Sequence, residues 1–171
     1  MRRLLPLLAL LAAGALACGY TLVGKGSNIP PEIKKVYLKA FENKTERVRV
    51  DQLLTQAVAD ELVNRQRFEM TNSDQGADAE LDGTVIGFEV TPVTFDADRR
   101  ATEYEITITA KVQLRQFVPD QVLWHNDRYQ FRNSYQLESS ELGFLDRETP
   151  AIEATAKKFA ETMVSDLLEG F

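Results

Sequence analysis

The side chains that most often carry nucleophilic or metal chemistry are scarce here, because the sequence has one histidine, His125, and one cysteine, Cys18. A histidine-activated nucleophile would have to use His125, which we interpret as a structural or surface imidazole. The count alone excludes metal sites built from several His and Cys ligands. The chain also lacks a P-loop, a G-x-G-x-x-G loop and a G-x-S-x-G motif. We therefore predict a protein that is not an enzyme and has no cofactor, with a hydrolase dependent on His125 as an alternative.

A second candidate chemistry is cation binding by acidic residues that lie close together, Asp74, Asp78, Glu80 and Asp82. Carboxylate oxygens are ligands for calcium, but these residues lack the spacing of an EF-hand loop. We interpret Asp78, Glu80 and Asp82 as the solvated face of a strand or loop, and we predict no metal site.

The basic residues indicate a different function, the binding of an anionic group. Arg99 and Arg100 are adjacent in a stretch expected to form a hairpin tip. A guanidinium donates two hydrogen bonds in a fixed fork, which suits phosphate or carboxylate groups on a lipid headgroup. Further basic residues on the polar faces of the next two strands predict either a continuous positive surface or a solvated, salt-bridged face: Lys111, Arg115, Arg128 and Arg132.

The N-terminal segment has the pattern of a lipoprotein signal. Two arginines precede an apolar run, residues 4–16, which is too short to span a membrane and leads into Ala15-Leu16-Ala17-Cys18. Because this ending resembles a lipobox, we expect residues 1–17 to be removed and Cys18 to be lipidated, which would tether the chain to a membrane. Gly19 in place of Asp favours the outer membrane. The alternative is a free thiol in a secreted protein.

Length and charge set further bounds on the fold and the partners. With 171 residues, 44% of them apolar, the chain is expected to form one folded domain. The net charge of −6 argues against sequence-independent binding of nucleic acid, which needs many basic residues. Residues 18–32 contain three Gly and two Pro and are expected to be an irregular leader, followed by a single domain over residues 33–171.

Hydrophobic periodicity predicts the elements that must position these residues. A helix is expected over 51–65 with Asp51 as its N-cap, and a long C-terminal helix is expected to be capped by Thr149 and opened by Pro150. Strands are expected over 33–41, 67–71, 79–93, 104–117 and 122–135, with a β-bulge in 79–93 and hairpin turns around 96–102 and 118–121. This order predicts an α+β fold, a two-layer sandwich of two helices on a mostly antiparallel four-stranded sheet.

Several short motifs, taken in order, resemble the LptE family of lipopolysaccharide-assembly lipoproteins. They include C-G-Y-x-L from Cys18 to Leu22, Ile29-Pro30-Pro31, Phe41-x-Asn43-x-Thr45, L-L-T-Q-A-V-A-D-E-L in the first helix, Ala77-Asp78-x-x-Leu81-x-Gly83, and Glu103-Tyr104. The resemblance implies an outer-membrane lipoprotein that carries diacylglycerol and palmitate on its cysteine, assists assembly of the LptD β-barrel and sits inside it as a plug.

The same resemblance implies which residues would contact lipopolysaccharide. Family contacts are basic residues in the loop before the Glu-Tyr strand and in the segment before the last helix, and the corresponding positions here are Arg99 or Arg100, and Arg147. The hypothesis from another functional class is a tethered periplasmic lipoprotein that regulates a cell-wall synthase, with no barrel partner.

Overall fold

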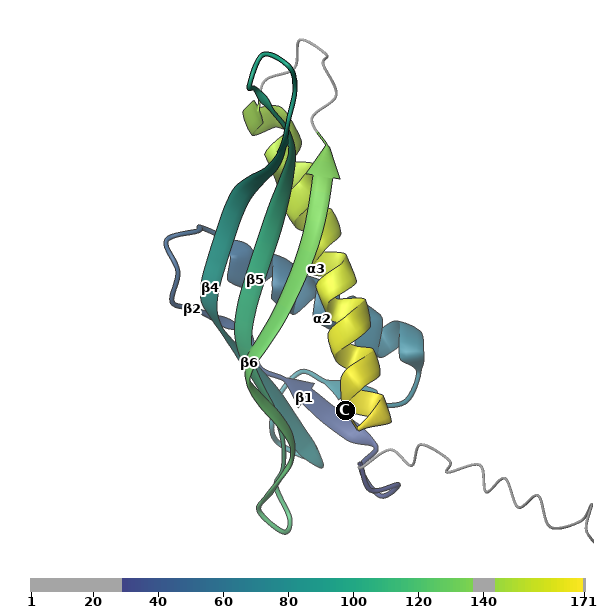
Figure 1. The fold of residues 1–171 in the computed structure, drawn as a ribbon. Helices are drawn as coiled ribbons and strands as arrows, with labels where there is room; N and C mark the ends of the chain where they lie inside the picture. The colour runs from purple at the N-terminus through teal and green to yellow at the C-terminus, as the bar shows by residue number, and fades with distance from the viewer. Residues whose placement is uncertain (1–28, 137–143, 171) are drawn as a thin grey trace, which may run out of the picture.

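The computed structural model describes residues 29–136 and 144–170 as a six-stranded mixed sheet with two helices packed on one of its faces (Figure 1). The elements are β1 (Lys35–Leu38), β2 (Glu42–Asn43), α2 (Val50–Arg65), β3 (Glu69–Thr71), β4 (Ala79–Phe95), β5 (Ala101–Gln116), β6 (Gln121–Gln136) and α3 (Phe144–Glu169). The expected α+β class is confirmed, but the expected count of four strands is wrong.

The strands β1 and β3 fall where strands were expected, whereas β2 was not expected. All three are short and pair in parallel, which periodicity within each segment does not predict. The main path of the sheet runs β3-β1-β4-β5-β6, and β2 pairs with β4. The strand β1 is parallel to both β3 and β4, because α2 carries the chain over the sheet between β1 and β3. The two long hairpins, β4 with β5 and β5 with β6, are antiparallel as expected.

The strand β5 shows why the sheet buries one face. Ile106, Ile108, Ala110, Val112 and Leu114 alternate along it and are at most 2% exposed. Their neighbours in the alternation point to the other face, as the period of two requires. The core is completed by the helices, whose inner stripes include Leu54 and Leu62 of α2 and Phe159 and Met163 of α3.

The predicted bulge in β4 is confirmed at Ile86. Val85 pairs with Ala110 and Gly87 pairs with Thr109, so Ile86 is the extra residue. The shift changes which parity of β4 faces the core. A second glycine, Gly83, admits an aromatic ring from the β1–β2 region, because a Cβ placed there would lie 2.3 Å from Cε1 of Phe41.

Both expected helix starts are wrong. The helix α2 begins at Val50, one residue before Asp51, and the preceding Arg49 adopts a left-handed conformation (φ 68°) without a side-chain cap. The helix α3 begins at Phe144, so Thr149 does not cap it and Pro150 lies inside it. Proline is tolerated in the first turn of a helix, which is why Pro150 was expected to open α3. The sequence pattern alone does not show whether a proline lies in the first turn or further along the helix. Neither helix in the described ranges is both long and apolar enough to cross a bilayer.

Candidate functional site

The tip of the β4–β5 hairpin is held by Asp96. Its Oδ1 accepts hydrogen bonds from the backbone N–H groups of Asp98 (2.9 Å) and Arg100 (2.8 Å). Its own N–H donates to the carbonyl of Arg100 (2.9 Å), and the N–H of Arg99 donates to the carbonyl of Asp96 (3.1 Å). Arg99 takes the left-handed conformation (φ 61°) that closes the turn. The loop backbone is therefore fixed while both arginine side chains are exposed.

Apolar side chains are exposed just below these arginines. Val93 is 47% exposed and Phe95 is 57% exposed, close to the end of β4. Exposed apolar side chains that form a contiguous patch rimmed by polar residues mark interaction sites. We define the hairpin tip as Val93, Phe95 and the Asp96–Arg100 loop. It combines guanidinium groups that can bind anions with apolar surface.

The first turns of α3 lie at the same end of the sheet as the hairpin tip (Figure 1). Arg147 is in this part of α3, and its side chain lies outside the described residues. The next residue, Glu148, is buried and its Oε1 lies 3.1 Å from Nη1 of Arg47, which comes from the loop before α2. The guanidinium of Arg47 also lies 5.5 Å from the ring centre of Phe88 on β4. This ion pair ties the start of α3 to the loop before α2, and the contact of Arg47 with Phe88 ties that loop to the sheet.

Two tyrosines lie next to this ion pair. The rings of Tyr104 and Tyr135 stack with their centres 5.8 Å apart on neighbouring strands. Burial raises the pKa of Tyr135, and the nearby carboxylate of Glu148 raises it further. Tyr135 therefore stays neutral at physiological pH, and the two stacked rings act in packing.

The remaining basic residues do not form the continuous positive surface that was one of two expectations. Arg115 makes a double hydrogen bond to the carboxylate of Asp120, and Arg132 lies 3.9 Å from Glu105. Arg115 also stands opposite Glu80 in the register of β4 and β5. The outer face of the sheet carries mixed charge, which is the salt-bridged alternative.

The other sequence-derived candidates have structural places or lie outside the described residues. His125 is exposed on β6 opposite Gln113. Asp78 accepts the backbone N–H groups of Lys34 and Lys35, both at 2.8 Å, and these bonds lower its pKa. No acidic, His or Cys group suited to a metal occurs within residues 29–136 and 144–170. Cys18 falls outside the described residues.

Sequence reasoning missed Arg47, Glu148 and the exposed Phe95. The partners Arg47 and Glu148 are 101 residues apart, so no spacing rule joins them. Phe95 carried a usable signal, because it lies four residues from Arg99 in a polar loop region.

The comparisons with known proteins identify the family. A family model described as LptE, lipopolysaccharide-assembly, matches residues 33–167. The chain belongs to the LptE family. No curated protein matches the chain.

Solved structures share the fold of this LptE-family chain at low identity. An uncharacterized lipoprotein B from Nitrosomonas europaea is 14% identical with a TM-score of 0.55, covering 88% of this chain and 90% of its own. A minor lipoprotein from Acinetobacter baumannii is 13% identical with a TM-score of 0.51, covering 82% and 94%. The PelC dodecamer from Paraburkholderia phytofirmans is 14% identical with a TM-score of 0.52, covering 82% and 92%. At such identities these likenesses establish the fold alone.

Proposed function

We propose that this chain is a non-enzymatic outer-membrane lipoprotein that binds lipopolysaccharide at its hairpin tip and plugs an LptD-type β-barrel whose assembly it assists. Residues 1–17 are the signal, Cys18 is the lipid anchor, residues 18–32 are the leader and residues 33–171 are the functional domain. The observation that carries the proposal is the hairpin tip of an LptE-family chain, where Arg99 and Arg100 are exposed on a backbone fixed by Asp96.

The chemistry of the hairpin tip fits a phosphorylated, acylated ligand. Within the described residues, the structure gives the guanidinium groups of Arg99 and Arg100 no ion pair, so both are available to phosphates. The exposed Phe95 and Val93 offer apolar contact beside them. Arg147 belongs to the start of α3, at the same end of the sheet as the hairpin tip, and would add a third cation.

The proposed anchor and the hairpin tip belong to opposite ends of the sheet. The strand β1, close to where the leader joins the domain, pairs with the first residues of β4, from Ala79 to Leu81. The Asp96–Arg100 loop of the tip follows Phe95, so about 14 strand residues, or roughly 45 Å, separate the two ends. A domain tethered by Cys18 could therefore present its arginines far from the leaflet that holds its anchor (Figure 1).

The outer face of the sheet supports a plug inside a barrel. The helices cover one face, and the other carries threonine, glutamine and charged side chains along β5 and β6, including Thr107, Lys111 and Gln130. Barrel interiors are polar, so such a surface can be surrounded by a barrel without an apolar patch.

The experiment for the tip compares two triple variants of equal charge change. Arg99→Glu, Arg100→Glu and Arg147→Glu are combined in one protein, and Lys111→Glu, Arg128→Glu and Arg132→Glu in the control. We expect the tip variant to bind lipopolysaccharide at least about tenfold more weakly, while the control keeps most of its affinity. Both variants lose the same long-range electrostatic attraction, so a difference between them reports contacts made at the tip. Equal losses in the two variants would refute the assignment of the tip.

The experiment for the partner extracts the lipidated chain from membranes in mild detergent. We expect a large β-barrel protein to co-purify in a ratio of about one to one. Recovery of a cell-wall synthase without a barrel would contradict the plug and favour the regulatory hypothesis.

A further inference from the structure

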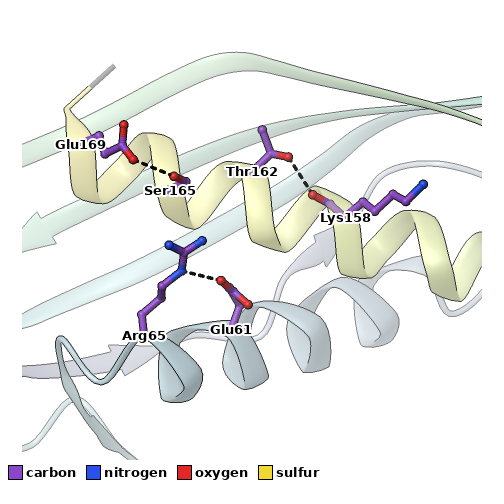
Figure 2. Close-up of polar contacts among 6 residues, drawn as sticks. All are labelled: Glu61, Arg65, Lys158, Thr162, Ser165 and Glu169. Carbon is purple, nitrogen blue, oxygen red and sulfur yellow. Dashed lines mark hydrogen bonds and ion pairs between the residues drawn. The ribbon is translucent and has the colours of Figure 1, made fainter.

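A groove runs between α2 and α3 on the side of the helices away from the sheet. We define the interhelical groove by its apolar floor, Leu53, Ala57, Val63 and Ala156, and by the polar residues along its walls; its volume is about 550 Å³. Val63 is 58% exposed, so a large apolar side chain of this groove faces solvent. Figure 2 shows the α2 side of this region, where Arg65 reaches toward α3 while its Nε donates to Oε1 of Glu61 (2.6 Å).

The described chain begins beside one end of this groove. The carbonyl of Pro30 lies 3.5 Å from Nη2 of Arg67, and Nη1 of Arg67 donates to the carbonyl of Ile33 at 3.1 Å. Arg67 lines a second hollow beyond the end of α2, and Val63 lines both this hollow and the interhelical groove. The described chain therefore begins beside a hollow that shares Val63 with the interhelical groove.

We propose that the interhelical groove is the docking site of the chain's own leader segment, Tyr20–Val23. Tyr20, Leu22 and Val23 are the apolar side chains between Cys18 and Ile29, and they fall together before the polar stretch 24–28. An apolar cluster in a polar leader and an exposed apolar floor beside the leader's junction complement each other. Their contact removes both surfaces from water.

The leader is long enough to lie along the groove. Leu22 is seven residues before Ile29, which allows a reach of about 23 Å in extended chain. The groove floor from Val63 to Leu53 covers ten helical residues, or about 15 Å. The segment can therefore lie along the floor while it remains connected to Ile29.

Charge also favours this occupant. The groove walls carry three carboxylates, Asp60, Glu61 and Glu153, and one cation, Lys157. The leader carries one charged side chain between Gly19 and Asn28, the cation Lys25. Lys25 follows the apolar segment and would pass the carboxylate of Asp60 on the groove wall, where attraction between the two charges stabilises the docked state.

Docking would shorten the free tether to the two residues before Tyr20. The domain would then be held close to, and in a defined orientation on, whatever surface retains Cys18. This consequence depends on the proposed lipid anchor, whereas docking of Tyr20–Val23 does not.

The test is a disulfide trap in the full chain expressed and processed in cells. Leu22→Cys is combined with Val63→Cys, and after mild oxidation of the membranes we expect an intramolecular disulfide, identified by mass spectrometry of the joined peptides. The matched control combines Leu22→Cys with Val93→Cys, which places a thiol of similar exposure at the hairpin tip (47% for Val93 against 58% for Val63). Val63→Cys alone reports any bond to the native Cys18.

A second measurement uses trypsin cleavage after Lys25 in the same membranes. We expect Val63→Asp to accelerate this cleavage by about tenfold, because proteolysis follows the undocked population. Val122→Asp, a similar change at an exposed valine of β6, is expected to leave the rate unchanged.

Three outcomes overturn the proposal: a trapped yield no higher than in the Val93 control, a disulfide that joins two chains, or equal cleavage rates in the two aspartate variants. None of these readouts involves a barrel or lipopolysaccharide. Failure of the proposed function therefore leaves the docking result interpretable, and failure of docking leaves the proposed function standing.

Discussion

The ion pair between Arg47 and Glu148 provides a quantitative test of how the site is built. Its partners differ in burial, since 35% of the Arg47 side chain and 9% of the Glu148 side chain are exposed. Removing one partner of a fully buried pair costs about 3–5 kcal/mol, because the other charge is left unpaired. The two single substitutions should therefore have unequal costs.

We expect Arg47→Met to lower the free energy of unfolding by about 2 kcal/mol, since it leaves the buried carboxylate of Glu148 unpaired while solvent near Arg47 moderates the loss. The methionine keeps an apolar stem against Phe88. Glu148→Gln should cost only about 1 kcal/mol, because the partly exposed guanidinium of Arg47 can be hydrated. For a chain of this size these costs correspond to falls in Tm of about 4–8 °C and 2–4 °C.

Thermal and urea unfolding followed by circular dichroism measure both values. Arg115→Met is the control, because its ion pair with Asp120 joins two side chains that are 48% and 63% exposed, so its loss should leave the free energy of unfolding nearly unchanged. If Glu148→Gln were as costly as Arg47→Met, or if both matched the control, the argument that burial of Glu148 sets the cost would be wrong.

Three further predictions concern other contacts. Gly83→Ala should cost about 1–3 kcal/mol in urea unfolding because its Cβ would overlap the ring of Phe41, and Phe41→Leu in the same chain should recover part of the loss. The Tyr129 hydroxyl donates to Oδ2 of Asp166 at 2.6 Å, and burial raises the pKa of this hydroxyl. Because the folded state holds the proton more tightly than the unfolded chain, the free energy of unfolding should fall as pH rises above about 10. Tyr129→Phe should remove the part of this pH dependence that comes from Tyr129. Asp96→Ala should speed amide exchange in the hairpin tip without changing the unfolding midpoint; protection equal to the parent would contradict the role of its Oδ1.

Strands and bulges whose hydrophobic pattern depends only on residues close in the chain could be predicted from the sequence. The alternation in β5 and the change of parity in β4 were sufficient for a half-buried strand and a bulge, and the structure has both. Helix starts were less predictable. Asp51 and Thr149 are good capping residues, yet α2 begins after Arg49 and α3 begins at Phe144, because packing against the rest of the fold outweighs a cap worth about 1 kcal/mol.

The sequence by itself determined the chemistry of the hairpin tip, because adjacent Arg99 and Arg100 in a turn with an aspartate acceptor need only local geometry. It also determined the signal pattern at Cys18 and the motifs that indicate the family. Only the tertiary structure decided the parallel pairing of β1 with β3 and β4, the contact of Arg47 with Glu148 and the groove between α2 and α3. Each of these joins segments far apart in the chain, and their free energy arises from burial and pairing that exist only after the helices pack on the sheet.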